Sequence, residues 1–172
     1  MVQIKANLIS KTITSNSKEA QNLFGEKRFG ERVGEKIFYT LSESLFLVQD
    51  KKMEIFDYKD KKLTEKEIEI KFQRMDKNFK TKFLVFKDLR KKGYIVKTAL
   101  KFGAEFRVYD KNKSAKEHSK WILFPVSENS TMTWHNFSAK NRVAHSTKKN
   151  LLIAVVDEES DVSYYEVKWT KP

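Results

Sequence analysis

The chain has 172 residues, of which 35 are Lys or Arg and 23 are Asp or Glu, giving a formal charge of +12 at pH 7. This length allows one ordinary domain or two small ones, and the basic surplus favours a polyanionic partner such as nucleic acid over a merely soluble basic protein. The absence of cysteine excludes disulfides, thiol nucleophiles and Cys-ligated zinc. No apolar run reaches the ~20 residues that span a bilayer, and the N-terminus does not resemble a signal peptide, so we expect a cytoplasmic protein with no membrane partner.

Hydrophobic periodicity in the first half predicts a mixed α/β unit. Thr64 and Glu67 have the spacing of a capping box, and Leu63 and Ile68 are placed as a hydrophobic staple, so a helix is expected to begin there. Ser42 is placed to cap an earlier, short helix. The other expected elements are strands at residues 2–9, 37–41 and 53–58 and a helix at residues 17–24.

The second half is expected to begin with a helix and to continue mainly as strands. Four apolar side chains recur on one side of residues 78–92, and Gly93 suits the end of that helix. Residues 151–156 are apolar throughout, which is typical of a central strand buried on both faces. The remaining expected elements are strands at residues 94–100, 105–109, 121–126 and 162–169 and a helix at residues 133–147.

This order of elements predicts the fold class α/β (α+β), with two small mixed domains. The boundary is expected near residue 80, inside or just before the helix at residues 78–92, although no linker rich in Pro or Ser marks it. We therefore expect an N-terminal α/β domain at residues 1–80 and a C-terminal domain at residues 81–172. The second domain is expected to have a mixed central sheet flanked by helices.

Polar groups suited to proton transfer lie at the ends of the expected strands in the second half. Tyr109 closes one strand, His118 lies just before the next, and Lys148 and Lys149 lie before a third. RNA can be cleaved without a metal because its 2′-hydroxyl is the nucleophile, and the protein then moves two protons and stabilises phosphoryl charge. An imidazole suits the general acid, and an ammonium group suits the stabilisation of the phosphoryl charge. A phenol can act as the general base only if a nearby cation lowers its pKa; otherwise it serves to orient the 2′-hydroxyl. In this basic chain the three groups favour metal-independent cleavage of RNA.

Each of these residues also has an ordinary structural interpretation, which the sequence leaves open. A tyrosine at a strand end is commonly a core or interface aromatic, and a histidine or lysine in a polar segment is commonly solvated. No metal-ligand spacing links His118, His135 and His145, so we assign no metal site and expect no cofactor.

Six blocks follow one another through the second half: 84–90 (LVFKDLR), 93–98 (GYIVKT), 101–109 (KFGAEFRVY), 117–119 (EHS), 142–146 (RVAHS) and 154–157 (AVVD). Together they resemble the archaeal tRNA-splicing endonuclease, or tRNA-intron lyase, of the short single-repeat type. The resemblance is dense from residue 83 to residue 172. The first half resembles the family mainly in the order of its elements.

The resemblance implies catalytic roles for three residues. The tyrosine that ends the FRVY strand is the family's general base and is Tyr109 here, and the histidine of the EHS block is its general acid and is His118 here. The family's HSVRK block reads HSTKK in this chain. Its lysine that stabilises the transition state therefore matches Lys149, and Lys148 stands where the family usually has Arg. With all three positions filled, the resemblance disfavours the family's noncatalytic paralogue.

The resemblance also implies a substrate. This would be precursor tRNA, or another RNA, with a bulge–helix–bulge at its exon–intron junctions, cut to leave 2′,3′-cyclic phosphate and 5′-hydroxyl ends. Arg142 matches one of two arginines that hold an extruded base in the family, whereas the region around Tyr164 leaves the second position unassigned. Lys101 and Lys148 are further candidates for RNA binding.

Family members of this length assemble as four subunits, in which an acidic loop docks in a basic pocket of a neighbouring subunit and C-terminal strands pair. The resemblance therefore implies self-association as a homotetramer. The residues that match the acidic loop are Asp157, Glu158, Glu159 and Asp161, with Ser160 in place of a common Gly. The same residues also suit a solvated turn between two strands.

Two other classes of function remain open from the sequence. The chain could be a noncatalytic RNA-binding or assembly subunit that keeps the fold without cleaving. It could also be a DNA-binding module whose helix at residues 133–147 presents Asn136, Lys140, Asn141 and Arg142. Cleavage of bulge–helix–bulge RNA in EDTA separates the first alternative from an endonuclease, and competitor DNA in a binding assay tests the second.

Overall fold

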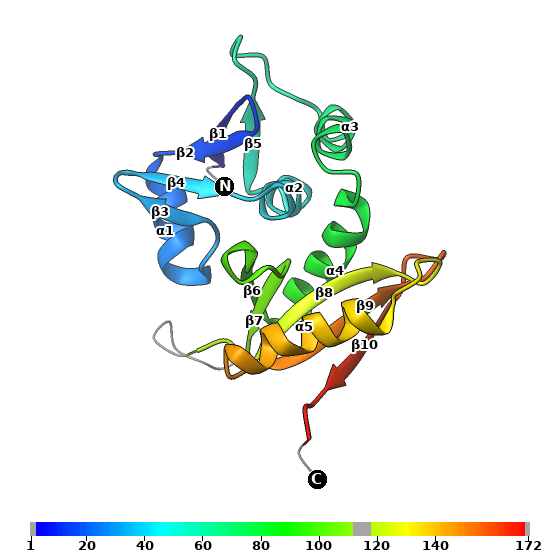
Figure 1. Ribbon diagram of the computed structural model, residues 1–172. Helices are drawn as coiled ribbons and strands as arrows, with labels where there is room; N and C mark the ends of the chain where they lie inside the picture. The colour runs from blue at the N-terminus through cyan, green and yellow to red at the C-terminus, as the bar shows by residue number, and fades with distance from the viewer. Residues whose placement is uncertain (1–2, 112–117, 171–172) are drawn as a thin grey trace. The chain divides into compact units, whose positions relative to one another are not determined.

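The computed structural model describes residues 3–111 and 118–170. The chain divides into two compact units, Met1–Phe83 and Leu84–Pro172. Helix α4 (Phe79–Lys91) runs across this division, and each unit contains, within the described residues, a five-stranded sheet with helices (Figure 1). The predicted mixed α/β fold class is therefore confirmed.

The sheet of the first unit is built from short strands. They are β1 (Ile4–Ile9), β2 (Thr12–Ser15), β3 (Glu31–Val33), β4 (Lys36–Tyr39) and β5 (Met53–Phe56). Their order is β3-β4-β2-β1-β5, with β1 parallel to β5 and the other neighbours antiparallel. Alternation along β1 buries Ile4, Ala6 and Leu8 and exposes the residues between them, as expected of a strand with one face on the core.

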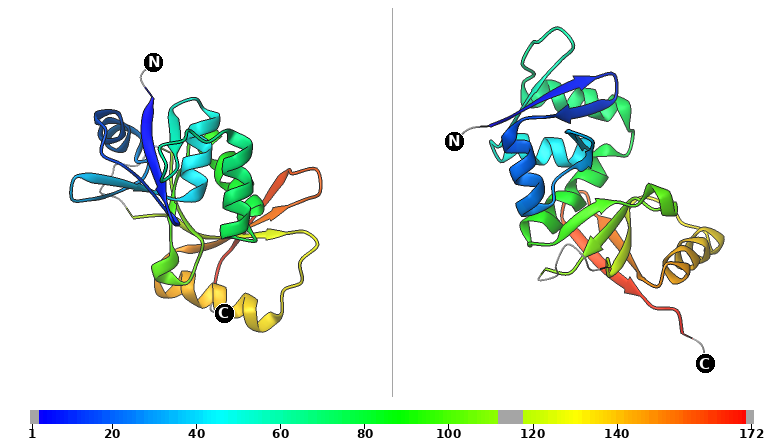
Figure 2. Two further views of the ribbon diagram at one scale, coloured as in Figure 1. Left: turned by 90° about the horizontal axis from the view of Figure 1, so that it is seen from above. Right: turned by 90° about the vertical axis from the view of Figure 1, so that its left-hand side faces the viewer.

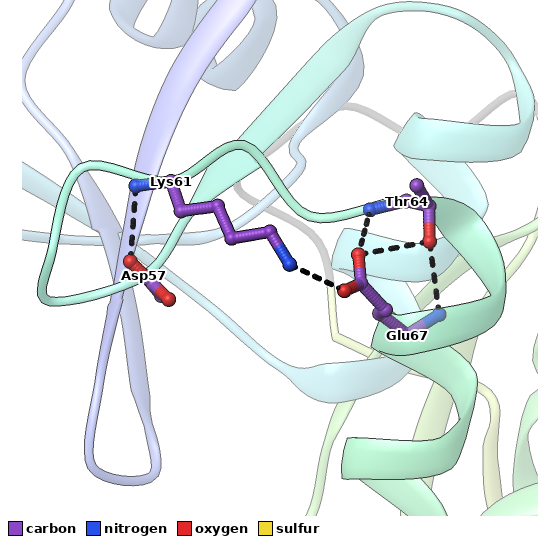
Figure 3. Close-up of polar contacts among 4 residues, drawn as sticks. All are labelled: Asp57, Lys61, Thr64 and Glu67. Atoms are coloured by element: carbon purple, nitrogen blue, oxygen red, sulfur yellow. Dashed lines mark hydrogen bonds and ion pairs between the residues drawn. The ribbon is translucent and has the colours of Figure 1, made fainter.

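The helices of the first unit begin at side-chain caps. They are α1 (Lys18–Lys27), α2 (Leu41–Gln49) and α3 (Glu65–Met75). Thr64 and Glu67 form the predicted capping box at the start of α3 (Figure 3), and both residues of the predicted staple, Leu63 and Ile68, are buried.

The predicted cap at Ser42 is wrong. Helix α2 is capped by Thr40, whose hydroxyl accepts a hydrogen bond from the Glu43 backbone, and Ser42 is buried within the helix. One oxygen of the Glu43 carboxylate accepts the Gly30 N–H at 2.9 Å, and the other accepts the Thr40 N–H at 3.1 Å. The buried carboxylate of Glu43 therefore satisfies the N–H groups of both Gly30 and Thr40. These hydrogen bonds favour a cap at Thr40, two residues before the predicted cap at Ser42.

The second unit has strand order β10-β9-β8-β7-β6. Strands β8 and β9 are parallel, joined through α5, and the other neighbours are antiparallel. The elements are β6 (Ile95–Thr98), the short 3₁₀ helix η1 (Leu100–Phe102), β7 (Phe106–Tyr109), β8 (Trp121–Ser127), α5 (Trp134–Ser146), β9 (Asn150–Val156) and β10 (Val162–Val167).

Helices cover both faces of this sheet. Ala144 of α5 packs with Ile122 and Leu151 in one buried cluster, and Figure 2 shows α5 lying along one side of the strands. On the other face, Phe86 in α4 lies 6.0 Å from Phe106, measured between ring centres. The predicted central sheet flanked by helices is present.

Several boundaries differ from the predictions. The strand expected at residues 94–100 ends at Thr98, because the chain turns into η1. Strands β2 and β3 were not predicted, since both are short and carry few apolar residues. Strand β9 lies next to the edge strand and β8 is central, so Ile153 and Val155 are only half-buried rather than enclosed on both faces. No helix in the described ranges is long and apolar enough to cross a membrane.

Candidate active site

One end of the second sheet collects the residues predicted to act on RNA. Strand β7 ends at Tyr109, and β8 and β9 begin just after the segments that contain His118 and Lys149. Because β7 is antiparallel to β8 and β8 is parallel to β9, the end of β7 and the starts of β8 and β9 share one end of the sheet. The topology therefore brings the three predicted catalytic residues to a common region.

Tyr109 is buried, with 6% of its surface exposed. Its backbone pairs with Ile95 at the start of β6. The guanidinium carbon of Arg107 lies 5.9 Å from the centre of the Tyr109 ring, a distance at which a cation interacts with an aromatic ring. Strand pairing thus fixes the backbone that carries the phenol, and the Arg107 cation lies next to the ring.

His118 enters the site from a segment attached to β7. The histidine is exposed, whereas the next residue, Ser119, is buried. The Lys120 N–H donates a hydrogen bond of 2.9 Å to the Val108 carbonyl. An exposed imidazole two residues from this anchor can reach a ligand at the end of the sheet.

Lys149 lies in the tight connection between α5 and β9. Lys148 adopts a left-handed conformation with φ 55°, and the Lys149 N–H donates to the Ala144 carbonyl at 2.9 Å. The turn leaves Lys148 exposed and Lys149 half-buried, with the Lys149 Nζ donating to the Thr147 carbonyl at 2.8 Å. The two neighbouring lysines, which the sequence alone could not separate, therefore have different environments.

The pKa of the Lys149 ammonium is lowered from its ordinary value. Burial is the larger cause, since it disfavours the charged form, and the positive charge of Arg107 is the second. A coulombic effect of this kind requires the two cations to lie close together. Arg107 therefore lies beside the Tyr109 ring, and its charge acts on Lys149.

Sequence reasoning missed Arg107. It lies two residues before Tyr109 in β7, so both side chains lie on the same face of the strand. The register puts Arg107 opposite Ile122 and Ile122 opposite Leu151, the residue two beyond Lys149. The alternation of side chains along a strand could have predicted it, because a tyrosine that is expected to act as a base requires a nearby cation.

The predicted RNA-binding residues lie in different places. Arg142 is exposed on α5, about one helical turn before its last residue, and Lys148 is exposed beside Lys149. Lys101 is exposed in η1, which follows the last residue of β6. Tyr109 pairs with Ile95, the first residue of β6, so Lys101 lies at the other end of these strands. The structure therefore brings Arg142 and Lys148 to the end of the sheet that carries Lys149, and it does not bring Lys101 there.

The acidic residues form the turn between β9 and β10. The Asp157 carboxylate accepts the Asp161 N–H at 2.8 Å, and Ser160 has a left-handed φ of 73°, the conformation for which glycine is commonly used. Glu158, Glu159 and Asp161 are exposed. Because β9 runs from Asn150 to Val156, the turn lies at the opposite end of the sheet from Lys149, about 20 Å away along the strand.

In the part of the chain that the structure describes, no group of three His, Asp or Glu side chains is placed to hold a metal ion.

Comparisons with known proteins match both halves of the chain. Residues 79–164 match the model of the tRNA intron endonuclease catalytic C-terminal domain, and residues 4–69 match that of the tRNA intron endonuclease N-terminal domain. A tRNA-splicing endonuclease of Pyrococcus abyssi is 41% identical over 158 residues, covering 92% of this chain and 91% of that protein. One of Nanoarchaeum equitans is 42% identical over 139 residues, covering 77% of this chain and 88% of that protein. One of Methanothermobacter thermautotrophicus is 36% identical, with 89% of each chain covered. The chain therefore belongs to the tRNA intron endonuclease family.

Proposed function

We propose that this protein is a tRNA-intron endonuclease that excises introns from precursor tRNA at bulge–helix–bulge junctions. Cleavage proceeds by metal-independent transesterification at the 2′-hydroxyl and leaves 2′,3′-cyclic phosphate and 5′-hydroxyl ends. We assign this chemistry to a C-terminal catalytic domain at residues 81–172, with residues 1–80 as the N-terminal domain. The observation that carries the proposal is the convergence of the end of β7 with the starts of β8 and β9, in a chain that matches the family's catalytic domain.

Three side chains carry out the proposed reaction. Tyr109 accepts the proton of the 2′-hydroxyl, or orients that hydroxyl. The 2′-oxygen of the RNA meanwhile forms a bond to the adjacent phosphorus. The bond from phosphorus to the 5′-oxygen then breaks, and His118 donates a proton to this leaving oxygen. Lys149 stabilises the additional negative charge on the phosphoryl oxygens as they pass through the transition state.

A cleavage assay in EDTA tests the mechanism. A bulge–helix–bulge RNA is folded in monovalent salt, and its fold is verified by structure probing before the enzyme is added. We expect full cleavage and a cyclic phosphate end, with no cleavage by the matched variant Tyr109→Phe. Activity that disappears in EDTA and returns only with a divalent ion, while the RNA stays folded, would refute the mechanism.

We also propose that the chain assembles as a homotetramer through the acidic turn and the C-terminal strand. Three exposed carboxylates lie in the turn after β9, at the end of the sheet opposite Lys149. They are therefore too far from the cations of their own catalytic end to neutralise them, and remain available to a basic surface of another copy. Strand β10 is an edge strand, whose outer backbone groups a second copy could pair.

The assembly can be tested without disturbing the turn. Because the Asp157 carboxylate shapes it, we leave Asp157 in place and change Glu158→Gln, Glu159→Gln and Asp161→Asn together. The matched control changes the exposed Glu26, Glu31 and Glu35 of the first unit to Gln. We expect light scattering to report a tetramer for the wild type and the control and a smaller species for the turn variant. A wild-type monomer with full activity would contradict the assembly.

The alternative is a noncatalytic RNA-binding or assembly subunit of the same complex. Under this alternative the purified chain binds the RNA but leaves it intact. Cleavage that appears only after a second protein is added would favour it.

A further inference from the structure

Arg107 is a cation for which the described residues provide no anionic partner. It is half-buried in β7, and no carboxylate among the described residues pairs with its guanidinium. Its Nε atom is buried, yet no described residue accepts a hydrogen bond from it. A buried donor without an acceptor is unfavourable, and more so when the donor is charged. Hydrogen bonding among the described residues therefore does not account for the position of this donor.

A second cation, Lys149, is affected by the charge of Arg107. Lys149 is also half-buried, and its pKa is lowered by burial and by the charge of Arg107. Its Nζ donates to the neutral Thr147 carbonyl at 2.8 Å. Two cations held near one another in partly desolvated positions repel, and an anion between them would reverse the sign of that interaction.

The Tyr109 ring holds the guanidinium without occupying its donors. The guanidinium carbon is 5.9 Å from the ring centre, and a cation–π contact uses the charge of the guanidinium rather than its N–H groups. Terminal N–H groups of an arginine form a planar fork that matches two oxygens of a phosphate. Arg107 is therefore suited to a bidentate oxyanion.

We propose that Arg107 and Lys149 together form an anion site at this end of the sheet, and that Arg107 binds the non-bridging oxygens of a phosphodiester. That this phosphodiester is the scissile one rests on the proposed function. Arg107 donates hydrogen bonds only and forms or breaks no covalent bond. Its contacts strengthen as the phosphoryl group gains negative charge in the transition state.

A titration with inorganic phosphate tests the anion site without any cleavage. The Nε–Hε resonance of Arg107 is followed by ¹⁵N NMR in the wild type, with chloride at equal ionic strength as the reference. We expect a saturable shift, and at least tenfold weaker phosphate binding in Arg107→Gln. Lys97→Gln is the matched control, because Lys97 lies directly opposite Arg107 in β6, and it should bind phosphate like the wild type. The absence of a saturable shift, or equal binding by Arg107→Gln, would overturn the site.

Single-turnover cleavage then tests the role in the reaction. Arg107→Gln should cleave about 10²-fold more slowly than the wild type, the scale of a lost oxyanion donor, and Arg107→Lys should recover part of the rate. Replacing one non-bridging oxygen by sulfur should slow the wild type for one diastereomer and should slow Arg107→Gln less. Equal sulfur effects in both proteins would overturn the phosphate contact.

The two arms separate the two proposals. A protein that binds phosphate at Arg107 but cleaves no RNA retains the anion site and loses the proposed function. If the Arg107→Gln variant cleaves normally in EDTA, the proposed function stands and the inferred role of Arg107 in the reaction is rejected.

Discussion

Charged side chains are arranged in opposite ways in the two units. At the start of α3 in the first unit, Glu67 accepts hydrogen bonds from the Thr64 N–H at 2.8 Å and from Lys61 Nζ at 2.7 Å. The Asp57 carboxylate accepts the Lys61 N–H at 3.0 Å, which closes the turn (Figure 3). At the end of the second sheet that carries Tyr109, the positive charge of Arg107 instead acts on a second cation, Lys149.

Charges that build local structure in the first unit thus contrast with charges that we propose to bind a phosphate in the second. The acidic groups around α3 have partners within a few residues of the chain, so they define a turn and a helix end. Arg107 and Lys149 come from separate segments, the strand β7 and the connection before β9. No described carboxylate forms an ion pair with Arg107, and the phosphate that we propose would bind there. Substitutions in the two regions should accordingly affect different measurements.

The largest effect is expected at the end of the sheet. His118→Ala should reduce single-turnover cleavage roughly 10²–10⁴-fold, because the leaving oxygen then lacks a general acid. RNA affinity, measured by filter binding, should change little. The control is His135→Ala, an exposed histidine of α5, which should cleave at nearly the wild-type rate. Equal losses in the two variants would reject His118 as the acid.

The neighbouring lysines give a finer test of the same region. Lys149→Gln should slow cleavage about 10²-fold at saturating protein, because it removes a charge beside the phosphoryl group. Lys148→Gln should leave that rate nearly unchanged and weaken RNA binding. The slope of log affinity against log salt should become shallower by about 1, as expected for the loss of one phosphate contact. The reverse order would move the catalytic role to Lys148.

In the first unit, the expected effect is on stability. Thr64→Ala should lower the free energy of unfolding by about 1 kcal/mol, because the Glu67 N–H at the start of α3 loses its capping hydroxyl. Urea denaturation measures this loss, and cleavage by the folded protein should be unchanged. Thr64→Ser keeps the hydroxyl and serves as the control. A serine variant as unstable as the alanine variant would indicate that packing, not the cap, carries the effect.

The smallest effect is a pH dependence at the same cap. Hydrogen bonding by Lys61, followed by that from Thr64, lowers the pKa of Glu67 from 4.5 to about 2. The folded state therefore favours the carboxylate, so the stabilisation is present above pH 4.5 and is lost as pH falls toward 2. The urea midpoint of the wild type should exceed that of Glu67→Gln above this window, and the difference should shrink below it. Glu69→Gln, on the same helix, is the control; a difference independent of pH would contradict the linkage.

Local patterns predicted much of the fold. The helix expected at residues 133–147 is α5, which runs from Trp134 to Ser146, because a helical period depends on residues a few positions apart. One failure occurred where a tertiary contact competes with local preference. Serine is a common capping residue, so Ser42 was a reasonable prediction. The Glu43 carboxylate, however, accepts a hydrogen bond from Gly30, thirteen residues earlier in the chain, and Thr40 caps the helix.

The site was predicted only in part. The resemblance of the motifs assigned Tyr109, His118 and Lys149, and these roles remain predictions. The structure adds that the three lie at one end of a sheet, and that Lys101 lies at the other end of the hairpin formed by β6 and β7. Sequence position could not distinguish these ends, because adjacent antiparallel strands reverse the direction of the chain.

By itself, the sequence determined the fold class, the helix cap of α3, and the family, since each depends on residues that are close together or on motifs read in order. Only the tertiary structure decided that Arg107 and Lys149 are neighbours and that Lys148 and Lys149 differ in burial. The physical reason is that register and packing bring residues of separate strands together. An interaction between two such charges depends on distance and desolvation in space, which periodicity along the chain does not encode.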